Sequence, residues 1–165
     1  MNQNRVHMLE QDQKERRTNV SEVALGFTAE QAIEESKRCY SCKKPKCVEG
    51  CPVNVNIPEF IRHIKEGDFK GAYEVLTNSL LFPRITGRVC PQESQCEGSC
   101  IIGKKQGCEA VSIGTLERFI GDWASEQGIM PKYNIIENGK KVAIIGSGPS
   151  AITVAADLRK KGYSI

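Results

Sequence analysis

The sequence of 165 residues contains no long apolar run, a single tryptophan and only 6% aromatic residues. A membrane-spanning helix needs roughly 18 consecutive apolar residues, so we expect no contact with a membrane. Residues 1–5 lack the apolar core of a signal peptide, which predicts a cytoplasmic protein. The net charge of +3 is also too close to zero to indicate nucleic-acid binding.

The informative residues that the sequence does contain are its eight cysteines. In a reducing compartment, cysteines indicate metal or redox chemistry more often than disulfides. Seven of them form two blocks, Cys-x2-Cys-x4-Cys-x3-Cys-Pro and Cys-Pro-x4-Cys-x3-Cys, while Cys108 stands apart. The first block consists of Cys39, Cys42, Cys47 and Cys51, and the second consists of Cys90, Cys96 and Cys100.

The spacing within the blocks favours iron–sulfur clusters over zinc. Zinc modules usually present two separated Cys-x2-Cys pairs, whereas this chain has one such pair inside a longer run. Two-cluster ferredoxins also end a cysteine run in Cys-Pro, and that last cysteine binds the other cluster. By the same geometry, the first three cysteines would hold one cluster with a fourth ligand from the second block. Cys51 would then cross over to join Cys90 and Cys96.

Helical periodicity predicts most of the structure up to about residue 130. Residues 28–31, Thr-Ala-Glu-Gln, have the form of a capping box and predict a helix that leads into the first cysteine. A second helical stretch begins at Pro58, breaks near Gly67 and resumes over 69–80. A third helix is expected from Ser112 to about residue 128, with an apolar stripe along one face.

A glycine-rich turn indicates a different kind of fold after residue 131. The apolar run 142–145 predicts a buried parallel strand, and helical spacing follows the turn. Between them lies the pattern G-x-G-x-x-A, in which glycines make the tight turn and let a pyrophosphate approach the backbone. The candidate cofactor-binding residues are Gly146, Gly148, Pro149, Ser150 and Ala151.

Several longer stretches resemble one family, the N-terminal region of the small (beta) subunit of NADPH-dependent glutamate synthase and related FAD and iron–sulfur oxidoreductases. The likeness covers nearly the whole chain. It depends on residues 22–28, 32–39, 96–100 and 113–119, and on the Cys51-Pro52 and Cys90-Pro91 pairs. The resemblance implies an alpha-helical ferredoxin-like domain with two 4Fe–4S clusters, followed by an FAD domain and an NADPH domain.

The resemblance and the composition together divide the chain into three parts. We expect an N-terminal arm at 1–27, an alpha-helical ferredoxin-like iron–sulfur domain at 28–130, and at 131–165 a linker with the first strand, turn and helix of a Rossmann-type FAD domain. A dinucleotide fold needs further parallel strands and an acidic residue roughly 20 positions after the glycines. We therefore expect the chain to be cut inside that domain and, alone, to bind no FAD and to catalyse nothing.

The resemblance also implies the cluster ligands, position by position. One cluster would be held by Cys39, Cys42, Cys47 and Cys100, and the other by Cys51, Cys90, Cys96 and Glu117. Counting thiols alone would instead make Cys108 the eighth ligand. Glu117 shares its helix face with Ile113 and Ile120, so its carboxylate would be drawn toward the core and would need a metal or cationic partner. A surface carboxylate paired with a lysine is the alternative.

The implied function is electron transfer, and no residues form a constellation typical of a catalytic acid, base or nucleophile. In the full-length protein, NADPH would reduce FAD, and electrons would pass through the clusters to the large glutamate synthase subunit or another electron-accepting subunit. One alternative is a sister flavoprotein, a ferredoxin–NADP or sulfide oxidoreductase. Another is a structural docking module held by zinc. The basic residues within 37–46 form either a solvated face or a counter-charge for the clusters.

Overall fold

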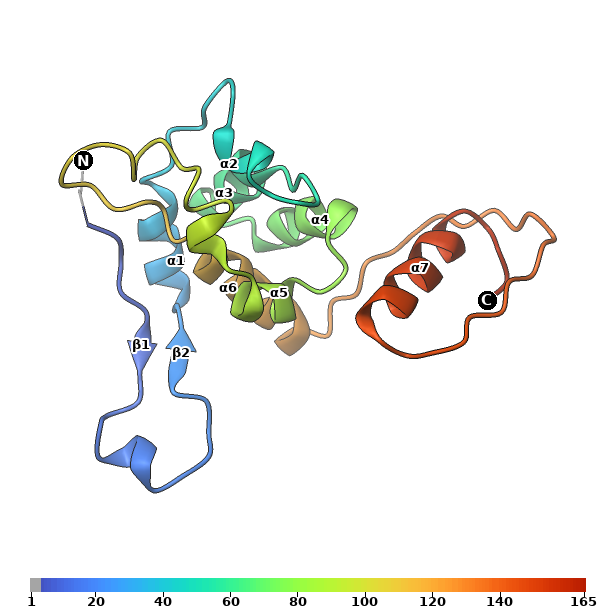
Figure 1. The fold of residues 1–165 in the computed structure, drawn as a ribbon, viewed down its shortest axis with the longest axis horizontal. Helices are drawn as coiled ribbons and strands as arrows, with labels where there is room; N and C mark the ends of the chain where they lie inside the picture. Colours follow the sequence, from blue (N-terminus) through green and yellow to red (C-terminus); the bar gives the residue numbers. More distant parts are fainter. Residues whose placement is uncertain (1–3) are drawn as a thin grey trace. The chain divides into compact units, whose positions relative to one another are not determined.

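The computed structural model describes residues 4–165 and is mainly α-helical, which confirms the expected fold class (Figure 1). The chain divides into two compact units, Met1–Ile129 and Met130–Ile165. No helix within residues 4–165 is both long and apolar enough to cross a bilayer. The helices are α1 (Ala29–Ser36), α2 (Lys46–Glu49), α3 (Ile57–Lys65), α4 (Phe69–Ser79), α5 (Pro83–Val89), α6 (Ile113–Glu126) and α7 (Pro149–Lys160), with the 3-10 turns η1 (Glu15–Arg17) and η2 (Gln92–Ser94).

Helix α1 begins as its sequence predicts. The Gln31 amide donates to the Thr28 hydroxyl at 3.3 Å, and the Gln31 side chain accepts from the Thr28 amide at 3.0 Å. This reciprocal capping box satisfies two amides that would otherwise lack a partner at the start of the helix. The helix ends at Ser36, whose carbonyl accepts from the Cys39 amide at 3.1 Å. The first cysteine is therefore held directly at the end of α1.

The core of the first unit lies between α3, α4 and α6. Apolar residues recur along each helix at spacings of three and four, so that each helix buries one face. The Phe69 ring of α4 lies edge-on to Phe119 and Trp123 of α6, with centroids 5.1 and 5.6 Å away. The buried side chains include Ile57, Phe60, Ile61 and Ile64 of α3, Ala72 and Leu76 of α4, and Ile113, Leu116, Phe119, Ile120 and Ala124 of α6.

Helix α5 is an element that the sequence patterns do not predict. It is short and contains a glycine, so its intrinsic helix propensity is weak. It packs on α6 at two points where glycine allows the backbones to approach. A Cβ on Gly87 would lie 2.6 Å from the Arg118 amide nitrogen, and one on Gly121 would lie 2.5 Å from that of Arg84. This contact brings Cys90, which follows α5, beside the middle of α6.

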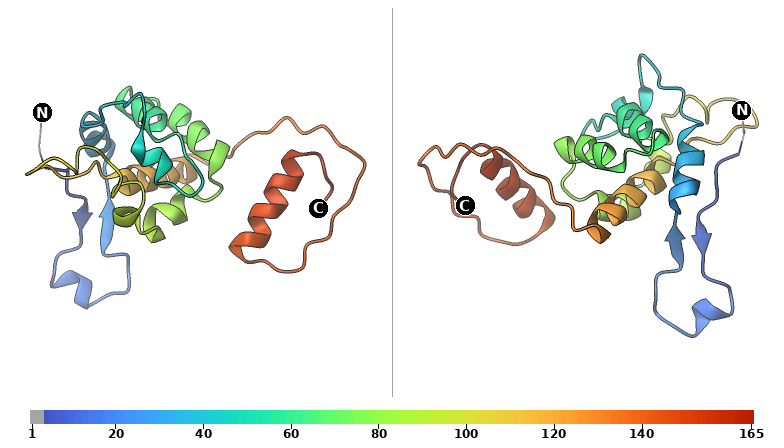
Figure 2. Two further views of the ribbon diagram at one scale, coloured as in Figure 1. Left: turned by 45° about the horizontal axis from the view of Figure 1, so that its top comes forward. Right: turned by 180° about the vertical axis from the view of Figure 1, so that it is seen from behind.

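The segment before α1 forms a hairpin of two strands, β1 (Leu9–Glu10) and β2 (Ala24–Gly26), which extends away from the helices of the first unit (Figure 2). Its pairing is antiparallel, with Leu9 opposite Gly26 and an irregularity after Leu9. The sequence shows no sustained period here, and we expected only a polar arm. Tertiary contacts order it, since the Arg118 guanidinium of α6 donates to the Ala24 carbonyl at 2.7 Å.

The second unit contains the predicted helix but not the predicted strand. The helix is α7, with Gly148 at its N-cap and Pro149 in its first turn. Instead of a strand over 142–145, Lys141 forms a single parallel bridge to Ser164, and Ile145 is fully exposed. The strand prediction is wrong for this chain, because a buried parallel strand needs neighbouring strands and residues 130–165 supply one bridge.

Candidate metal centres

Four cysteines from both sequence blocks line one pocket in the first unit, which we call the first thiol group: Cys39, Cys42, Cys47 and Cys100. Cys39 comes from the end of α1, Cys47 from α2, and Cys100 from the turns after η2. The other walls of the pocket are mainly apolar. They include Ile57 and Ile61 of α3, Ile113 of α6, and Ile101, Ile102 and Val111. The tertiary fold thus assembles a sulfur-rich pocket from segments that are far apart in the sequence.

In the first group, Cys100 is buried and the other three cysteines are partly buried, and their thiols influence one another. Burial raises the pKa of Cys47 to about 12, and the neighbouring sulfurs of Cys39 and Cys100 add to the rise. Burial also raises the pKa of Cys39, and the neighbouring Cys42 and Cys100 sulfurs raise it further. Thiolate ligands must be deprotonated, so metal binding in this pocket would release protons.

A second group forms around α5 and α6, and we call it the second thiol group: Cys51, Cys90, Cys96 and Glu117. Burial and the Glu97 carboxylate raise the pKa of Cys96 to about 12, with further contributions from Glu117 and Cys51. Burial also raises the pKa of Cys90, and the same Glu117 and Cys51 groups act on it. The structure therefore brings Cys51, the last cysteine of the first block, to the cysteines of the second block.

Glu117 lies among thiols and not at an exposed rim. Burial raises the pKa of its carboxyl to about 7, although the Thr86 hydroxyl of α5 donates to it at 2.5 Å and opposes that rise. Its hydrogen-bond partner is thus a neutral hydroxyl and not a lysine. Cys108 is partly buried and packs against the apolar core of the unit. These placements favour Glu117 over Cys108 as the fourth member of the second group.

The donor set of each group fits a 4Fe–4S cluster, which is held by four protein ligands, usually thiolates. Among the described residues, no three His, Cys, Asp or Glu side chains converge closely enough to hold one metal ion. A cluster takes its ligands differently, because each of its four irons needs only one of them.

A buried ion pair, which sequence reasoning missed, holds the first thiol group in place. Glu35 is fully buried, and its carboxylate accepts from Arg38 at 2.6 Å, from the Val6 amide at 2.7 Å and from the Ser112 amide at 2.8 Å. It therefore joins the N-terminal segment, α1 and the start of α6 beside Cys39. The sequence does contain a signal for this pair, a Glu and an Arg three residues apart on a predicted helix. Its burial does not follow from that spacing, because it depends on the other segments.

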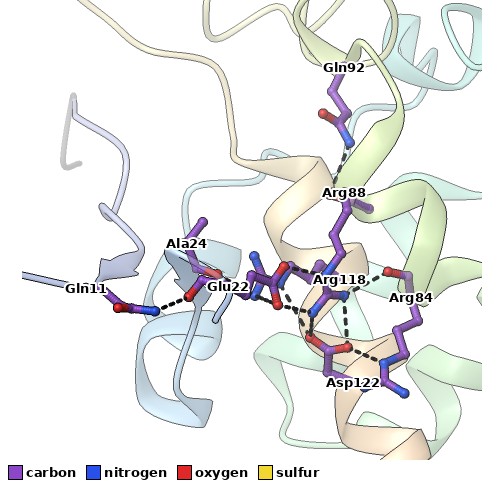
Figure 3. A network of polar contacts seen from close by, with 9 residues as sticks. Gln11, Glu22, Ala24, Arg84, Arg88, Gln92, Arg118 and Asp122 are labelled. Atoms are coloured by element: carbon purple, nitrogen blue, oxygen red, sulfur yellow. Dashed lines mark hydrogen bonds and ion pairs between the residues drawn. The ribbon is translucent and has the colours of Figure 1, made fainter. Parts of the chain in front are cut away.

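A partly exposed network of charges fixes α5 against α6 near the second thiol group (Figure 3). The Asp122 carboxylate of α6 accepts from Arg88 at 2.7 Å and from Arg84 at 2.9 Å, both on α5. Arg88 also pairs with Glu22 at 2.7 Å, and Glu22 lies 3.3 Å from Arg118. The network ties the segment before β2 to the two helices that position Cys90 and Glu117.

The glycine-rich turn of the second unit has the backbone that its sequence predicts. Gly146 has a φ of +120°, a conformation that glycine adopts without strain, and Gly148 caps α7. Pro149, Ser150 and Ala151 form the first turn of that helix. A helix N-terminus that follows such a turn is suited to an anion, but the turn is exposed and has no adjacent sheet within residues 130–165.

Comparison with known proteins gives one family and several relatives. The family described as "Dihydroprymidine dehydrogenase domain II, 4Fe-4S cluster" matches residues 16–129. The small chain of NADPH glutamate synthase from Azospirillum brasilense is 41% identical over 92% of this chain and 31% of its own length. In Escherichia coli K12, the putative oxidoreductase AegA is 39% identical over 91% of this chain and 23% of its own length. The PreT subunit of NAD-dependent dihydropyrimidine dehydrogenase from the same organism is 33% identical over 88% of this chain and 35% of its own length.

Proposed function

Because the chain belongs to the dihydropyrimidine dehydrogenase domain II family of 4Fe–4S proteins, we propose that it carries electrons through two such clusters, one at each thiol group. The ligands of the first are Cys39, Cys42, Cys47 and Cys100. The ligands of the second are Cys51, Cys90, Cys96 and Glu117. When bound, the clusters supply one-electron carriers whose potentials depend on their surroundings.

The observation that carries this proposal is the crossover between the sequence blocks. Cys100 joins three cysteines of the first block, and Cys51 joins two of the second. Two-cluster ferredoxins exchange a ligand in the same way. The crossover keeps the two groups adjacent, because Cys47 and Cys51 are separated by only three residues. Adjacent sites suit a role in which electrons pass from one to the next.

The polypeptide around the proposed clusters shields and positions their ligands. The isoleucines of α3 and α6 exclude water from the first group, and burial changes the potential of such a site. The Glu35–Arg38 pair fixes the backbone that bears Cys39, and the Thr86 hydroxyl orients the Glu117 carboxylate. None of these residues needs to transfer a proton for electrons to pass.

The chain spans about a third of the length of the glutamate synthase small chain that it matches. The parent protein would be an NADPH-dependent oxidoreductase of the glutamate synthase type. In it, Gly146, Gly148 and residues 149–151 would hold FAD, and FAD would supply the capacity to accept hydride. Its electrons reach the large subunit or another electron-accepting subunit. The name of the Azospirillum relative supports this. The 165 residues alone are inactive and retain no FAD, since α7 lacks the sheet beside which a dinucleotide binds.

The direct test is a chemical assay of iron, acid-labile sulfide and zinc on protein purified without oxygen. We expect about eight irons and eight sulfides per chain, as two 4Fe–4S clusters require, and no stoichiometric zinc. Zinc without sulfide would contradict the proposal and support a structural module.

The ligand crossover is tested with the single variants Cys51→Ser and Cys100→Ser. Each should lower the iron content to about half, and electron paramagnetic resonance should show that the two variants lose different clusters. Loss of the same cluster in both variants would refute the crossover.

The proposal that the 165 residues alone retain no FAD is tested by titrating FAD against the chain and following flavin fluorescence. We expect no saturable binding in the micromolar range.

A further inference from the structure

Lysines surround the first thiol group in the folded chain. Lys46 lines the same pocket as the four thiols. Lys65 ends α3, whose Ile61 and Ile57 line the same pocket. The Lys105 nitrogen lies 4.7 Å from the centre of the Tyr40 ring, which also lines the pocket. With their sequence neighbours they form what we call the lysine rim, all of it exposed: Lys43, Lys44, Lys46, Lys65, Lys104 and Lys105.

Two apolar side chains are exposed within the lysine rim. Tyr40 is 40% exposed and Ile101 is 39% exposed, and both line the pocket of the first thiol group. A small apolar centre inside a polar rim is the usual anatomy of a protein interface. A protein that covered Tyr40 and Ile101 would contact side chains that line the same pocket as the cysteines.

The charge of the rim defines the partner that it fits. Lys46 is paired with Glu49 at 2.7 Å, which offsets one positive charge. Lys105 instead donates to the neutral Tyr40 hydroxyl at 3.2 Å, so its charge is not offset by that contact. Lys43, Lys44 and Lys104 extend the same sign of charge along the two cysteine loops. The surface is therefore complementary to a protein face rich in Asp and Glu.

We propose that the lysine rim, with Tyr40 and Ile101 at its centre, is the docking surface for the acidic face of a redox partner protein. This inference rests on the proposed function, because the first thiol group needs a redox partner close to it only if it carries electrons. Opposite charges on two surfaces accelerate encounter and fix the orientation of the complex. The apolar centre then excludes water where the two proteins are closest.

A nucleic acid is the other macromolecule that a lysine patch could bind. Single-stranded nucleic acids are held by several aromatic side chains on which successive bases stack. Tyr40 is the aromatic residue that the lysine rim surrounds, and Lys105 already lies over its ring. We therefore test a protein partner, and a single-stranded nucleic acid serves as a control probe.

The test measures binding of a strongly acidic plant-type 2Fe–2S ferredoxin to the cluster-loaded chain by isothermal titration calorimetry. The double variant Lys65→Glu/Lys105→Glu reverses two charges of the rim. The matched control Lys14→Glu/Lys70→Glu makes the same change in net charge at exposed positions on η1's flank and on α4. We expect the rim variant to weaken binding at least about tenfold, and the control less than about twofold, since charges at an interface act locally.

Salt and a second probe complete the design. Binding by the unchanged chain should weaken between 0.01 and 0.15 M salt, where the Debye length falls from about 30 to about 8 Å. Equal effects of the rim and control variants, no binding of the ferredoxin, or tighter binding of a 20-nucleotide single-stranded DNA would each overturn the docking proposal. Iron and sulfide are assayed in every sample, so a failure of the proposed function is recognised by missing clusters and a failure of docking by loaded protein that does not bind.

Discussion

Two carboxylates in the first unit, the fully buried Glu35 and the partly buried Glu117, have opposite surroundings, which agrees with a structural role for Glu35 and with the proposed ligand role of Glu117. Glu35 is paired with Arg38 and accepts two backbone amides, so its charge is satisfied by the protein. Glu117 is partly buried beside thiols with one hydroxyl as its hydrogen-bond donor, and its pKa is raised to about 7. A carboxylate in that position gains a counter-charge only when a metal centre is present.

Replacing Glu117 by alanine should therefore damage the second cluster, whereas Cys108→Ala should not. We expect the iron content of Glu117→Ala to fall toward half, because one ligand of four is lost and water must replace it. The measurement is iron and sulfide content with electron paramagnetic resonance of the reduced protein. Loss of a cluster in Cys108→Ala, with Glu117→Ala unaffected, would reverse the assignment.

Replacing Glu35 by alanine should destabilise the fold by about 3–5 kcal/mol, because the Arg38 guanidinium would stay buried without a counter-charge, with the Glu109 and Ala110 carbonyls still accepting from it. The matched control is Glu34→Ala, whose exposed pair with Lys37 should contribute about 0–1 kcal/mol. Urea unfolding of the cluster-loaded proteins, followed by circular dichroism without oxygen, measures both free energies. A loss in Glu35→Ala no larger than in Glu34→Ala would show that the buried pair does not hold the arm, α1 and α6 together.

At the scale of single elements, the start of α4 shows how a short helix is delimited. Asp68 accepts from the Gly71 amide at 2.9 Å and contacts the His63 ring at 2.8 Å. Both contacts lower the pKa of the Asp68 carboxyl, and the Gly71 amide has the larger effect. The chain can therefore end α3 and restart as α4 within three residues, and Gly67, with a φ of +76°, takes up the left-handed position at the end of α3.

We predict that Asp68→Ala lowers the free energy of unfolding by about 1 kcal/mol at pH 7, the usual effect of losing an N-cap. Because the pKa of Asp68 is lowered in the folded state, its contribution is complete above the unfolded value of about 3.9 and is lost as the pH falls through the lower folded value. The difference between the two proteins should thus shrink below about pH 4. Urea unfolding at several pH values measures it, and a difference that grew on acidification would contradict this sign.

Two kinds of polypeptide make up the first unit when it is considered as a whole. Helices α3, α4 and α6 share one apolar core, whereas the cysteine loops at 39–56 and 90–112 have little regular structure beyond α2 and η2. The loops contain cysteine sulfurs whose pKa values are raised by burial. A metal centre bound by these sulfurs would cross-link the loops. Stability is therefore expected to be uneven across the unit.

Removing iron with a chelator under anaerobic conditions should open these loops before the helical core. Amide hydrogen exchange, measured residue by residue or by peptide, should accelerate in 39–56 and 90–112 while α3, α4 and α6 retain slow exchange. The physical reason is that metal binding supplies the folding energy of segments without an apolar core of their own. Unchanged exchange in the loops of the metal-free protein would contradict this prediction.

The sequence by itself determined the local features of this protein. The capping box at Thr28 and Gln31, the apolar stripes of α3 and α6, and the turn before α7 depend on residues close together in the chain, so periodicity and capping rules predict them. The cysteine spacing likewise predicts clusters, because it reflects the reach of a short loop.

Only the tertiary structure decided features that depend on distant segments. Helix α5 forms because Gly87 and Gly121 let it pack on α6, and the strand expected over 142–145 is absent because it lacks neighbours. The burial of Glu35 requires Val6 and Ser112, which are far from it in the chain. Local propensity is weak at each of these positions, and contacts between elements therefore determine their conformation.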